Sequence, residues 1–434
     1  MKSASALGPC LALLLAGCAA NPPAAPRPQA AAPAPSPAAP GLPPLPLMGG
    51  DAGFQAYIRG FEPQAVAAGI TPDTYGRAMA GIAPLPGLAQ TVQNQPEFVK
   101  PIWTYLDSAV SDRRIRDAQG MLAAYGPLLA AIEARSGVPK EILVAIWGME
   151  TDYGHMLGSD SLFSALATAA YMNQGPRRAH AESELIAALR LLQQENYPVS
   201  EMVGSWAGAF GQTQFMPSTF FKYATDGDGD GRIDLWRSAP DALASTAALL
   251  RQEGWQAGKP WGYEVRLPPG FDYGQAGLGT QRPLSDWAAM GVETATGAAL
   301  PAGNDPAALY LPAGMRGPAF LLSGNFNVIM KYNNAASYAL AVGLLADRMA
   351  GAAPLAASWP RDERPLSREE RIRFQSELAQ LGYDPGTPDG LLGRKTRAAL
   401  TAYQKAKGLP ADGWPDAAML AALDADAAHV TAAR

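Results

Sequence analysis

Apolar residues recur at helical spacing over most of the chain, and this period constrains the fold more than any other feature of the sequence. Apolar side chains repeat every three or four positions at 121–135, 139–150, 161–171, 179–195, 240–253 and 324–349. That spacing is typical of helices that bury one face. A Gly- and Pro-rich stretch at 256–283, with β-type pieces such as 263–266, interrupts the helices. We therefore predict one large, mainly α-helical domain over 50–350.

Composition excludes several classes of protein. The chain has 434 residues, of which 48% are hydrophobic, so it can bury a real core in two or three domains. Its net charge is −5, and no run of Lys and Arg indicates a nucleic-acid-binding surface. The three histidines do not cluster, which argues against a His-rich metal site. We find no GxSxG, P-loop or HExxH pattern.

The N-terminus has the pattern of a secretory signal at 1–17. Lys2 is followed by an apolar stretch from Ala6 to Ala16, which is too short to span a membrane. Leu15-Ala16-Gly17-Cys18 resembles the bacterial lipobox, which implies cleavage before Cys18 and a lipid on Cys18. The alternative is an ordinary signal peptide that is cut a few residues later. Cys10 would leave with the signal, so the mature protein would contain no disulfide.

The position after Cys18 is Ala19 rather than Asp. By resemblance to known sorting rules, this favours the periplasmic face of the outer membrane. Residues 18–49 then form a Pro- and Ala-rich tether, with eleven prolines between Pro22 and Pro46. Such a segment favours extended polyproline II structure at ~3 Å per residue, so it can hold a domain away from its membrane anchor.

The segment 139–154 carries the strongest candidate for a catalytic group. Pro139 suits the first turn of a helix, in which Ile142, Leu143, Ile146 and Glu150 share one stripe. A carboxyl group on a buried stripe is costly unless it is paired or protonated, and desolvation raises its pKa. Gly154 ends the helix, so Glu150 also lies near the negative end of the helix dipole. These effects favour a general acid; the alternative is a structural Glu paired with an Arg.

A second segment, 204–218, alternates glycines with Gln and aromatic side chains. Glycines allow close approach of a ligand, amides can bond sugar hydroxyls, and rings can stack on pyranose faces. This composition predicts a sugar-binding groove. A Gly-rich junction between a helix and a loop is the alternative.

Four sequence blocks, in this order and spacing, resemble the membrane-bound type B lytic transglycosylases. The blocks are Trp147-Gly-Met-Glu-Thr-Asp-Tyr-Gly154, the stretch from Tyr171 through Pro176-Arg177-Arg178-Ala179, Gly208-Ala-Phe-Gly-Gln-Thr-Gln-Phe-Met-Pro-Ser218 and Lys331-Tyr332-Asn333. The resemblance implies a lysozyme-like helical catalytic domain with an inserted lobe. It also implies that Glu150 is the catalytic residue and that the substrate-binding positions are Tyr105, Ser205, Gln214, Tyr332, Asn333 and Tyr338.

The resemblance further implies cleavage of the β-1,4 bond between N-acetylmuramic acid (MurNAc) and N-acetylglucosamine (GlcNAc) in peptidoglycan, with 1,6-anhydro products and no catalytic cofactor. The expected partners are glycan strands, the membrane through the N-terminal lipid, and cell-wall synthesis complexes. Two alternatives remain: a hydrolytic muramidase, and a non-catalytic murein-binding lipoprotein.

An acidic loop at 226–237 begins like an EF-hand. Aspartates stand at its positions 1, 3 and 5, where hard oxygens surround Ca²⁺. Position 7 is Arg232, which would offer its backbone carbonyl, and position 12 is Arg237 instead of the bidentate Glu. Asp241 can close a longer loop. The predicted ligands of a structural Ca²⁺ are therefore Asp226, Asp228, Asp230, Arg232 and Asp241; the alternative is a solvated acidic turn.

The last part of the chain resembles a peptidoglycan-binding type 1 domain. A linker at 351–364 precedes a module at 365–426, for which we expect a small three-helix bundle. Its features are the segment 371–383, an Asp389-Gly390 turn, and a helix in which Thr396, Ala399, Leu400 and Tyr403 share a face. A small helical domain with no ligand, or with a protein partner, is the alternative.

Overall fold

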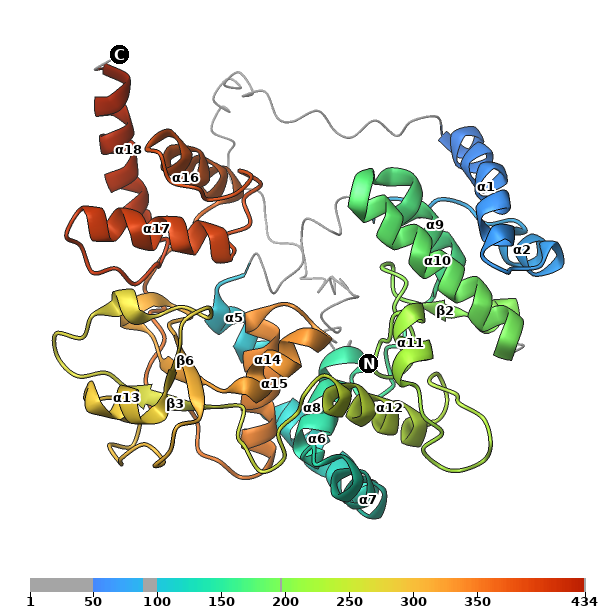
Figure 1. Ribbon diagram of the computed structural model, residues 1–434, viewed down its shortest axis with the longest axis horizontal. Coiled ribbons are helices and arrows are strands. Elements are labelled where there is room, and N and C mark those ends of the chain that lie inside the picture. Colours follow the sequence, from blue (N-terminus) through green and yellow to red (C-terminus); the bar gives the residue numbers. More distant parts are fainter. Residues whose placement is uncertain (1–49, 89–99, 196, 433–434) are drawn as a thin grey trace, which may run out of the picture.

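The computed structural model describes residues 50–88, 100–195 and 197–432, and Figure 1 shows their arrangement. The predicted signal at 1–17 and the predicted tether at 18–49, which includes Cys18, lie outside the described residues. The described chain is mainly helical, as predicted. None of its helices is both long and apolar enough to span a bilayer.

The helical body contains most of the chain between 50 and 350. Its helices are α1 (Gly50–Ala67), α2 (Pro72–Met79), α5 (Ile102–Ala109), α6 (Asp112–Ala124), α7 (Gly126–Ser136), α8 (Lys140–Thr151), α9 (Leu162–Met172), α10 (Gly175–Glu195), α11 (Pro217–Tyr223), α12 (Ala239–Gln252), α14 (Gly324–Tyr332) and α15 (Ala336–Met349). A short 3-10 turn (Val199–Glu201) and a two-stranded antiparallel ribbon, β1 (Asp160–Ser161) with β2 (Val203–Gly204), complete it.

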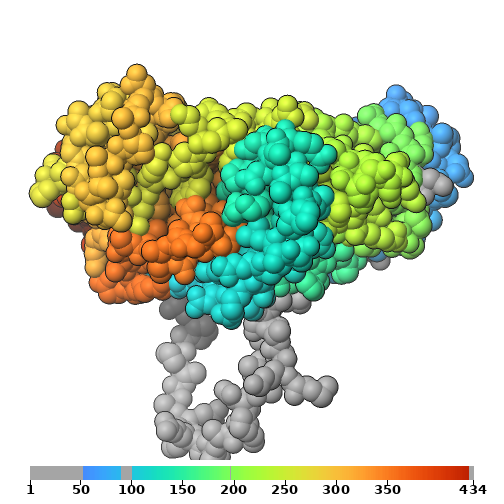
Figure 2. All heavy atoms as spheres, turned by 90° about the horizontal axis from the view of Figure 1, so that it is seen from below, coloured from blue at the N-terminus to red at the C-terminus, as the bar shows by residue number. Residues whose placement is uncertain are grey.

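Helix α8 is the centre of this body. Every residue from Ile142 to Thr151 is buried, so this part of the helix is enclosed on all sides and not along one stripe alone. It packs against α6, α7, α12 and α15. In Figure 2 the blue-green surface of the segments that precede α8 lies between an orange surface, from the region of α14 and α15, and a yellow-green surface, from the region of α11 and α12. A helix enclosed in this way holds any side chain near its end in a fixed position.

Two segments that were each predicted as one helix are two helices in the structure. The period at 121–135 is divided between α6 and α7 at Tyr125. Pro127, in the first turn of α7, has no N–H to continue the bonds of α6. The period at 324–349 is divided between α14 and α15, because Asn333 adopts an extended conformation with φ −140° and ψ 118°.

The inserted lobe lies between α12 and α14. It is an antiparallel sheet of strand order β4-β6-β7-β3-β5 with one covering helix. Its elements are β3 (Gly262–Arg266), a 3-10 turn (Tyr273–Gln275), β4 (Gln281–Pro283), α13 (Leu284–Ala289), β5 (Glu293–Thr294), β6 (Pro306–Tyr310), a 3-10 turn (Gly314–Arg316) and β7 (Ala319–Leu322). The lobe has a core of its own around the fully buried Trp287, whose indole N–H donates to Ala307 O at 3.0 Å.

Trp261 joins the lobe to the helical body. Its ring packs against Phe320 and Phe326 at centroid distances of 6.3 Å, and its indole N–H donates to Asp347 on α15 at 3.1 Å. Burial raises the pKa of Asp347 to about 6, although the bond from Trp261 opposes the shift. The lobe is therefore fixed to the same helix that borders α8.

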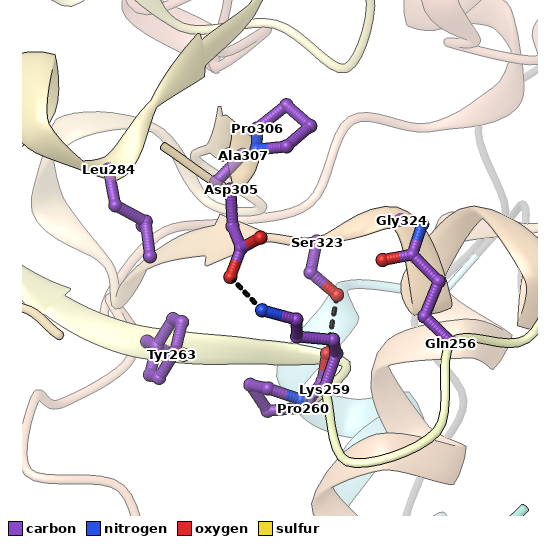
Figure 3. Close-up of a pocket in the computed structure, with 10 residues that line it drawn as sticks. All are labelled: Gln256, Lys259, Pro260, Tyr263, Leu284, Asp305, Pro306, Ala307, Ser323 and Gly324. Atoms are coloured by element: carbon purple, nitrogen blue, oxygen red, sulfur yellow. Dashed lines mark hydrogen bonds and ion pairs between the residues drawn. The ribbon is translucent and has the colours of Figure 1, made fainter. Parts of the chain in front are cut away.

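A small pocket also lies at this junction (Figure 3). An ion pair between Lys259 Nζ and Asp305, 2.5 Å long, and a bond from Ser323 Oγ to Pro260 O join residues that line it. None of the predicted site residues lines this pocket.

The C-terminal module consists of α16 (Arg368–Gln380), α17 (Arg394–Ala406) and α18 (Ala417–Ala432). Thr396, Ala399, Leu400 and Tyr403 are all buried, which confirms the predicted shared face of α17. A capping box between Ser367 and Glu370 begins α16. The three-helix prediction is confirmed.

The segment 351–364 is bound along the body. Arg361 forms a bidentate ion pair with Asp107 at 2.7 and 2.6 Å. The carboxylate of Glu264 accepts bonds from Ala356 N and Ala357 N, each at 2.9 Å. This segment therefore holds the module beside the lobe and α5.

A substitution at Gly343 tests the junction around Trp261. An added Cβ would lie 2.5 Å from the Trp261 ring, and the enclosed ring has little room to move. We expect Gly343→Ala to lower the free energy of unfolding by about 1–3 kcal/mol. The control is Gly120→Ala in α6, where nothing lies within 4 Å. The control should be neutral or stabilising by up to about 1 kcal/mol. Equal urea midpoints for the two variants would contradict this account of the junction.

Candidate active site

Glu150 lies in the last turn of α8 and is 1% exposed. The phenol of Tyr338, on α15, donates a hydrogen bond of 2.6 Å to Glu150 Oε1. Burial disfavours the carboxylate form, whereas a hydrogen bond donated to the carboxyl oxygen favours it. Two opposing effects of this kind suit a group that must be both protonated and ionised in one reaction cycle.

The end of α8 is fixed by bonds to the loop that follows β2. Thr151 Oγ1 donates to Gln212 O at 2.5 Å and accepts from Gly154 N at 2.9 Å. Asp152 terminates the helix in a left-handed conformation with φ 49°, so its side chain turns away from the buried interior. Asp152 pairs there with Arg113 at 3.3 Å. This neighbouring carboxylate therefore has a partner different from that of Glu150.

Tyr332 is the second predicted residue that lies near Glu150. Its phenol donates to Thr213 O, in the loop of the second sequence block. Burial is the main cause that raises the pKa of Tyr332, and the negative charge of Glu150 raises it further. Tyr332 therefore stays protonated and ties α14 to the loop at 211–215.

Gln214 and Asn333 each bury a polar atom that has no hydrogen-bond partner among the described residues. Gln214 adopts φ 53° and donates from Nε2 to Leu157 O at 3.2 Å and Gly211 O at 2.9 Å, but its Oε1 accepts nothing. Asn333 Nδ2 likewise donates to no described group. Since buried polar groups are nearly always bonded, these two atoms stand out as unsatisfied among the described residues.

Ser205 and Tyr105 are linked to the other predicted site residues through the loop and the helix on which they lie. Ser205 is 2% exposed, and its hydroxyl accepts from Ala209 N at 3.1 Å, so it shapes the glycine loop. Tyr105 is buried on α5, which packs against α15, the helix of Tyr338. Direct contacts therefore join Glu150 with Tyr338, and Tyr332 with the Gln214 loop, while Tyr105 is connected through helix packing.

Three residues near the end of α8 were not singled out from the sequence. They are Arg113, Tyr153 and Trp147, the last of which is a core residue. Arg113 pairs with Asp152, and the Trp147 ring makes T-shaped contacts with Tyr125 and Tyr153 at 5.3 and 5.7 Å. An added Cβ at Gly148 would lie 2.6 Å from Tyr153, which explains the glycine in that block. The glycine directly after Trp147, inside a predicted helix, was the available signal.

The acidic loop brings three of the predicted metal ligands together. Carboxylate oxygens of Asp226, Asp228 and Asp230 lie within 4.8 Å of one another. Asp226 accepts from Gly229 N at 2.6 Å and Gly231 N at 2.9 Å, and the bond from Gly231 is the main cause that lowers its pKa. The cluster thus has the spacing of the first three ligand positions of an EF-hand.

The carboxylate of Asp241 is not part of that cluster. Asp241 is buried, and its two oxygens accept from Gly227 N at 2.8 Å and Asp234 N at 2.7 Å. It therefore ties the two sides of the loop together. Arg237, at position 12, pairs with Glu201 at 2.6 Å.

Comparisons with known families divide the chain in two. Residues 53–347 match the model of the transglycosylase SLT domain, and residues 367–423 match that of a putative peptidoglycan binding domain. The second match spans most of the three helices of the C-terminal module.

Among curated proteins, the chain is 36% identical over 222 residues to membrane-bound lytic murein transglycosylase B of Escherichia coli strain K12. The match covers 49% of this chain and 58% of the length of that relative.

Among solved structures, SltB3 from Pseudomonas aeruginosa in complex with NAG-anhNAM-pentapeptide is 48% identical, with a TM-score of 0.80, and the match covers 86% of this chain and 99% of that one. Escherichia coli lytic transglycosylase Slt35 in complex with calcium is 28% identical, with a TM-score of 0.59, over 70% of this chain and 95% of that one. The family model, the curated relative and both structures agree with the predicted family and with its lysozyme-like fold. The chain therefore belongs to the family of lytic transglycosylases that carry the transglycosylase SLT domain.

Proposed function

We propose that this protein is a lytic transglycosylase that cleaves the β-1,4 bond between MurNAc and GlcNAc of peptidoglycan, with residues 50–350 as the catalytic domain and 365–426 as the murein-binding domain. The observation that carries the proposal is the buried carboxyl group of Glu150 held by Tyr338 at 2.6 Å. The relatives named above, one of which was solved with an anhydro sugar, support it.

In the proposed reaction, Glu150 first acts as an acid. It donates its proton to the glycosidic oxygen while the bond from that oxygen to C1 of MurNAc breaks, and GlcNAc leaves with a 4-hydroxyl group. The Glu150 carboxylate, now stabilised by the Tyr338 hydroxyl, then takes the proton from the C6 hydroxyl of MurNAc. O6 bonds to C1 and closes the 1,6-anhydro ring, so no water and no cofactor is consumed.

The ring closure is favoured because the attacking hydroxyl belongs to the same sugar. An intramolecular nucleophile has an effective concentration far above that of a separate molecule. The residues proposed to hold the strand are Tyr105, Ser205, Gln214, Tyr332, Asn333 and Tyr338. Among these, Gln214 Oε1 can accept from a sugar hydroxyl or amide, and Asn333 Nδ2 can donate to one.

Glu150→Gln tests the acid role. The amide keeps the shape of the side chain but cannot transfer the proton, so murein cleavage should fall by at least ~10². The matched control is Glu141→Gln in the same helix; Glu141 pairs with Lys140 at 3.0 Å on the outside of the body, so that variant should cleave like the parent. Release of soluble muropeptides from purified sacculi is the measurement.

The same assay separates the alternatives when it is run in ¹⁸O-water. A transglycosylase yields 1,6-anhydro products without ¹⁸O at C1, whereas a muramidase incorporates it. A folded Glu150→Gln variant that cleaves at the parental rate would contradict the assignment of Glu150. A parent that binds sacculi but releases no muropeptides would indicate a binding protein.

We further propose that the acidic loop holds a structural Ca²⁺ through Asp226, Asp228 and Asp230, with the Arg232 carbonyl as a further ligand and Asp241 as a brace. Three close carboxylates repel one another unless a cation binds, and the relative Slt35 was solved in complex with calcium. No step of the reaction passes through the ion.

Millimolar Ca²⁺ should raise the melting temperature of the parent by several degrees, because an ion that binds only the folded state stabilises it by mass action. Asp230→Asn should abolish this rise in melting temperature, because the substitution removes one negative charge from the site. The new amide oxygen can still accept from Arg232 N, which lies 2.8 Å from Asp230 Oδ1 in the parent, so the loop keeps that bond. Asp73→Asn, at an exposed site on α2, is the control. An unchanged parental melting curve would show that the loop is only an acidic turn.

We also propose that a lipid on Cys18 anchors the protein to the periplasmic face of the outer membrane, where cell-wall synthesis complexes are its expected partners. The lipobox-like sequence before Cys18 and the membrane-bound relative support this proposal. In membrane fractionation, Cys18→Ala should move the protein to the soluble fraction. A Cys18→Ala variant that sediments with the membranes would argue against the lipid anchor.

A further inference from the structure

The C-terminal module contains the same hydrogen-bonded turn twice. Each turn has the sequence Asp-Gly-apolar and is held by a buried glutamine, which directly follows an aromatic residue in the sequence. In each case the next helix begins five residues after the aspartate. The first turn, here named the outer clamp, consists of Gln375, Asp389, Gly390 and Leu391; the second, the inner clamp, consists of Gln404, Asp412, Gly413 and Trp414.

In the outer clamp, Gln375 Oε1 accepts from Gly390 N at 2.8 Å and Gln375 Nε2 donates to Asp389 Oδ1 at 3.4 Å. Asp389 Oδ1 also accepts from Leu391 N at 2.8 Å. Gly390 has φ 81°, which a glycine adopts without strain. Oδ1 of the aspartate is thus used within the turn, and Oδ2 remains for contacts outside it.

The inner clamp repeats this geometry. Gln404 Oε1 accepts from Gly413 N at 2.8 Å, and Gln404 Nε2 donates to Asp412 Oδ1 at 2.9 Å. Asp412 Oδ1 accepts from Trp414 N at 3.1 Å, and Gly413 has φ 65°. The two clamps therefore present an aspartate oxygen and an apolar side chain in the same arrangement.

The inner clamp is occupied by a piece of the inserted lobe. Asp412 Oδ2 accepts from Met315 N at 3.0 Å. The residue before Met315 is Gly314, where an added Cβ would lie 2.5 Å from Trp414 Cβ and 2.6 Å from Asp412 Oδ2. The inner clamp thus binds a backbone N–H, that of Met315, next to a glycine, which has no side chain.

The outer clamp presents the same groups to solvent. Asp389 is exposed, and its Oδ2 has no hydrogen-bond partner within the described chain. Leu391, which corresponds to Trp414, is 37% exposed.

We infer that the outer clamp is a binding site for the stem peptides of peptidoglycan. This inference rests on the proposed function, since that function supplies the polymer. Stem peptides offer secondary amide N–H groups beside small alanine side chains, which is the chemistry that the inner clamp accepts from Gly314 and Met315. Asp389 Oδ2 receives the peptide N–H, and Leu391 covers the adjacent small side chain.

The test compares binding of the full-length protein to intact sacculi and to sacculi whose stem peptides an amidase has removed. Asp389→Asn keeps an acceptor at Oδ1 for the turn but replaces the outward acceptor with an NH2 donor. Leu391→Ser removes the apolar contact. Each variant should bind intact sacculi about tenfold more weakly than the parent. Both should bind peptide-free sacculi as the parent does.

The matched control is Asp384→Asn, an exposed aspartate of the same loop whose Oδ1 accepts from Gly386 N at 3.0 Å. This control should bind both kinds of sacculi like the parent. Thermal melting of each variant checks that the module remains folded.

Three results would overturn the inference. Parental affinity of Asp389→Asn and Leu391→Ser for intact sacculi would exclude the outer clamp. Equal loss of affinity for intact and peptide-free sacculi would indicate that it contacts glycan. A parental dimer that Asp389→Asn dissociates in sedimentation would assign the clamp to a second copy of the chain.

In all three cases a parent that still releases anhydromuropeptides leaves the proposed function standing. A parent that neither binds nor cleaves sacculi overturns both the inference and the proposed function.

Discussion

The hydrogen bond between Tyr338 and Glu150 requires a carboxyl group to be buried, which costs solvation free energy. The helical body is packed around this bonded pair. A carboxyl group that is 1% exposed loses the solvation of its charged form, so it needs a bonding partner at a fixed place. That partner stands on α15, far from α8 along the chain. The two helices must therefore hold a constant spacing, and the burial of α8 on all sides provides it.

The break between α14 and α15 belongs to the same arrangement. In one continuous helix, at about 100° per residue, Tyr332 and Tyr338 would lie about 120° apart around the helix axis and would face different neighbours. The extended residue Asn333 interrupts the helix, so Tyr332 can reach Thr213 while Tyr338 reaches Glu150. The apolar period of 324–349 carries no sign of this break, which explains why the sequence predicts one helix there. A local departure from helix geometry at a candidate site is where such predictions usually fail.

Much else could be predicted because it depends on local pattern. The bounds of α8, α9, α10 and α12 follow the apolar period closely, and the buried face of α17 follows its spacing. The placement of Glu150 required only its position in a buried helix. By contrast, the partner of Asp152 and the bracing of the acidic loop by Asp241 depend on tertiary contacts between residues whose spacing in sequence carries no signal. The same holds for Gln214, whose left-handed backbone conformation no pattern of residue types announces.

The position of the C-terminal module is decided by close packing more than by charge. Arg361 with Asp107, and Arg316 with Asp362, join it and its linker to the body, but exposed ion pairs contribute roughly 0–1 kcal/mol each. The Trp414 ring instead lies 6.2 Å from that of Trp103, and its indole N–H donates to Glu363 at 2.7 Å.

Trp103 is on α5, two residues from Tyr105, and α5 packs on the helix of Tyr338. A partly buried aromatic contact of this kind contributes about 0.5–1.5 kcal/mol beyond the area that it buries, and the rings have preferred relative orientations. The orientation of the module is thereby linked through α5 to the helices that hold Glu150. A flexible linker alone would not provide that connection.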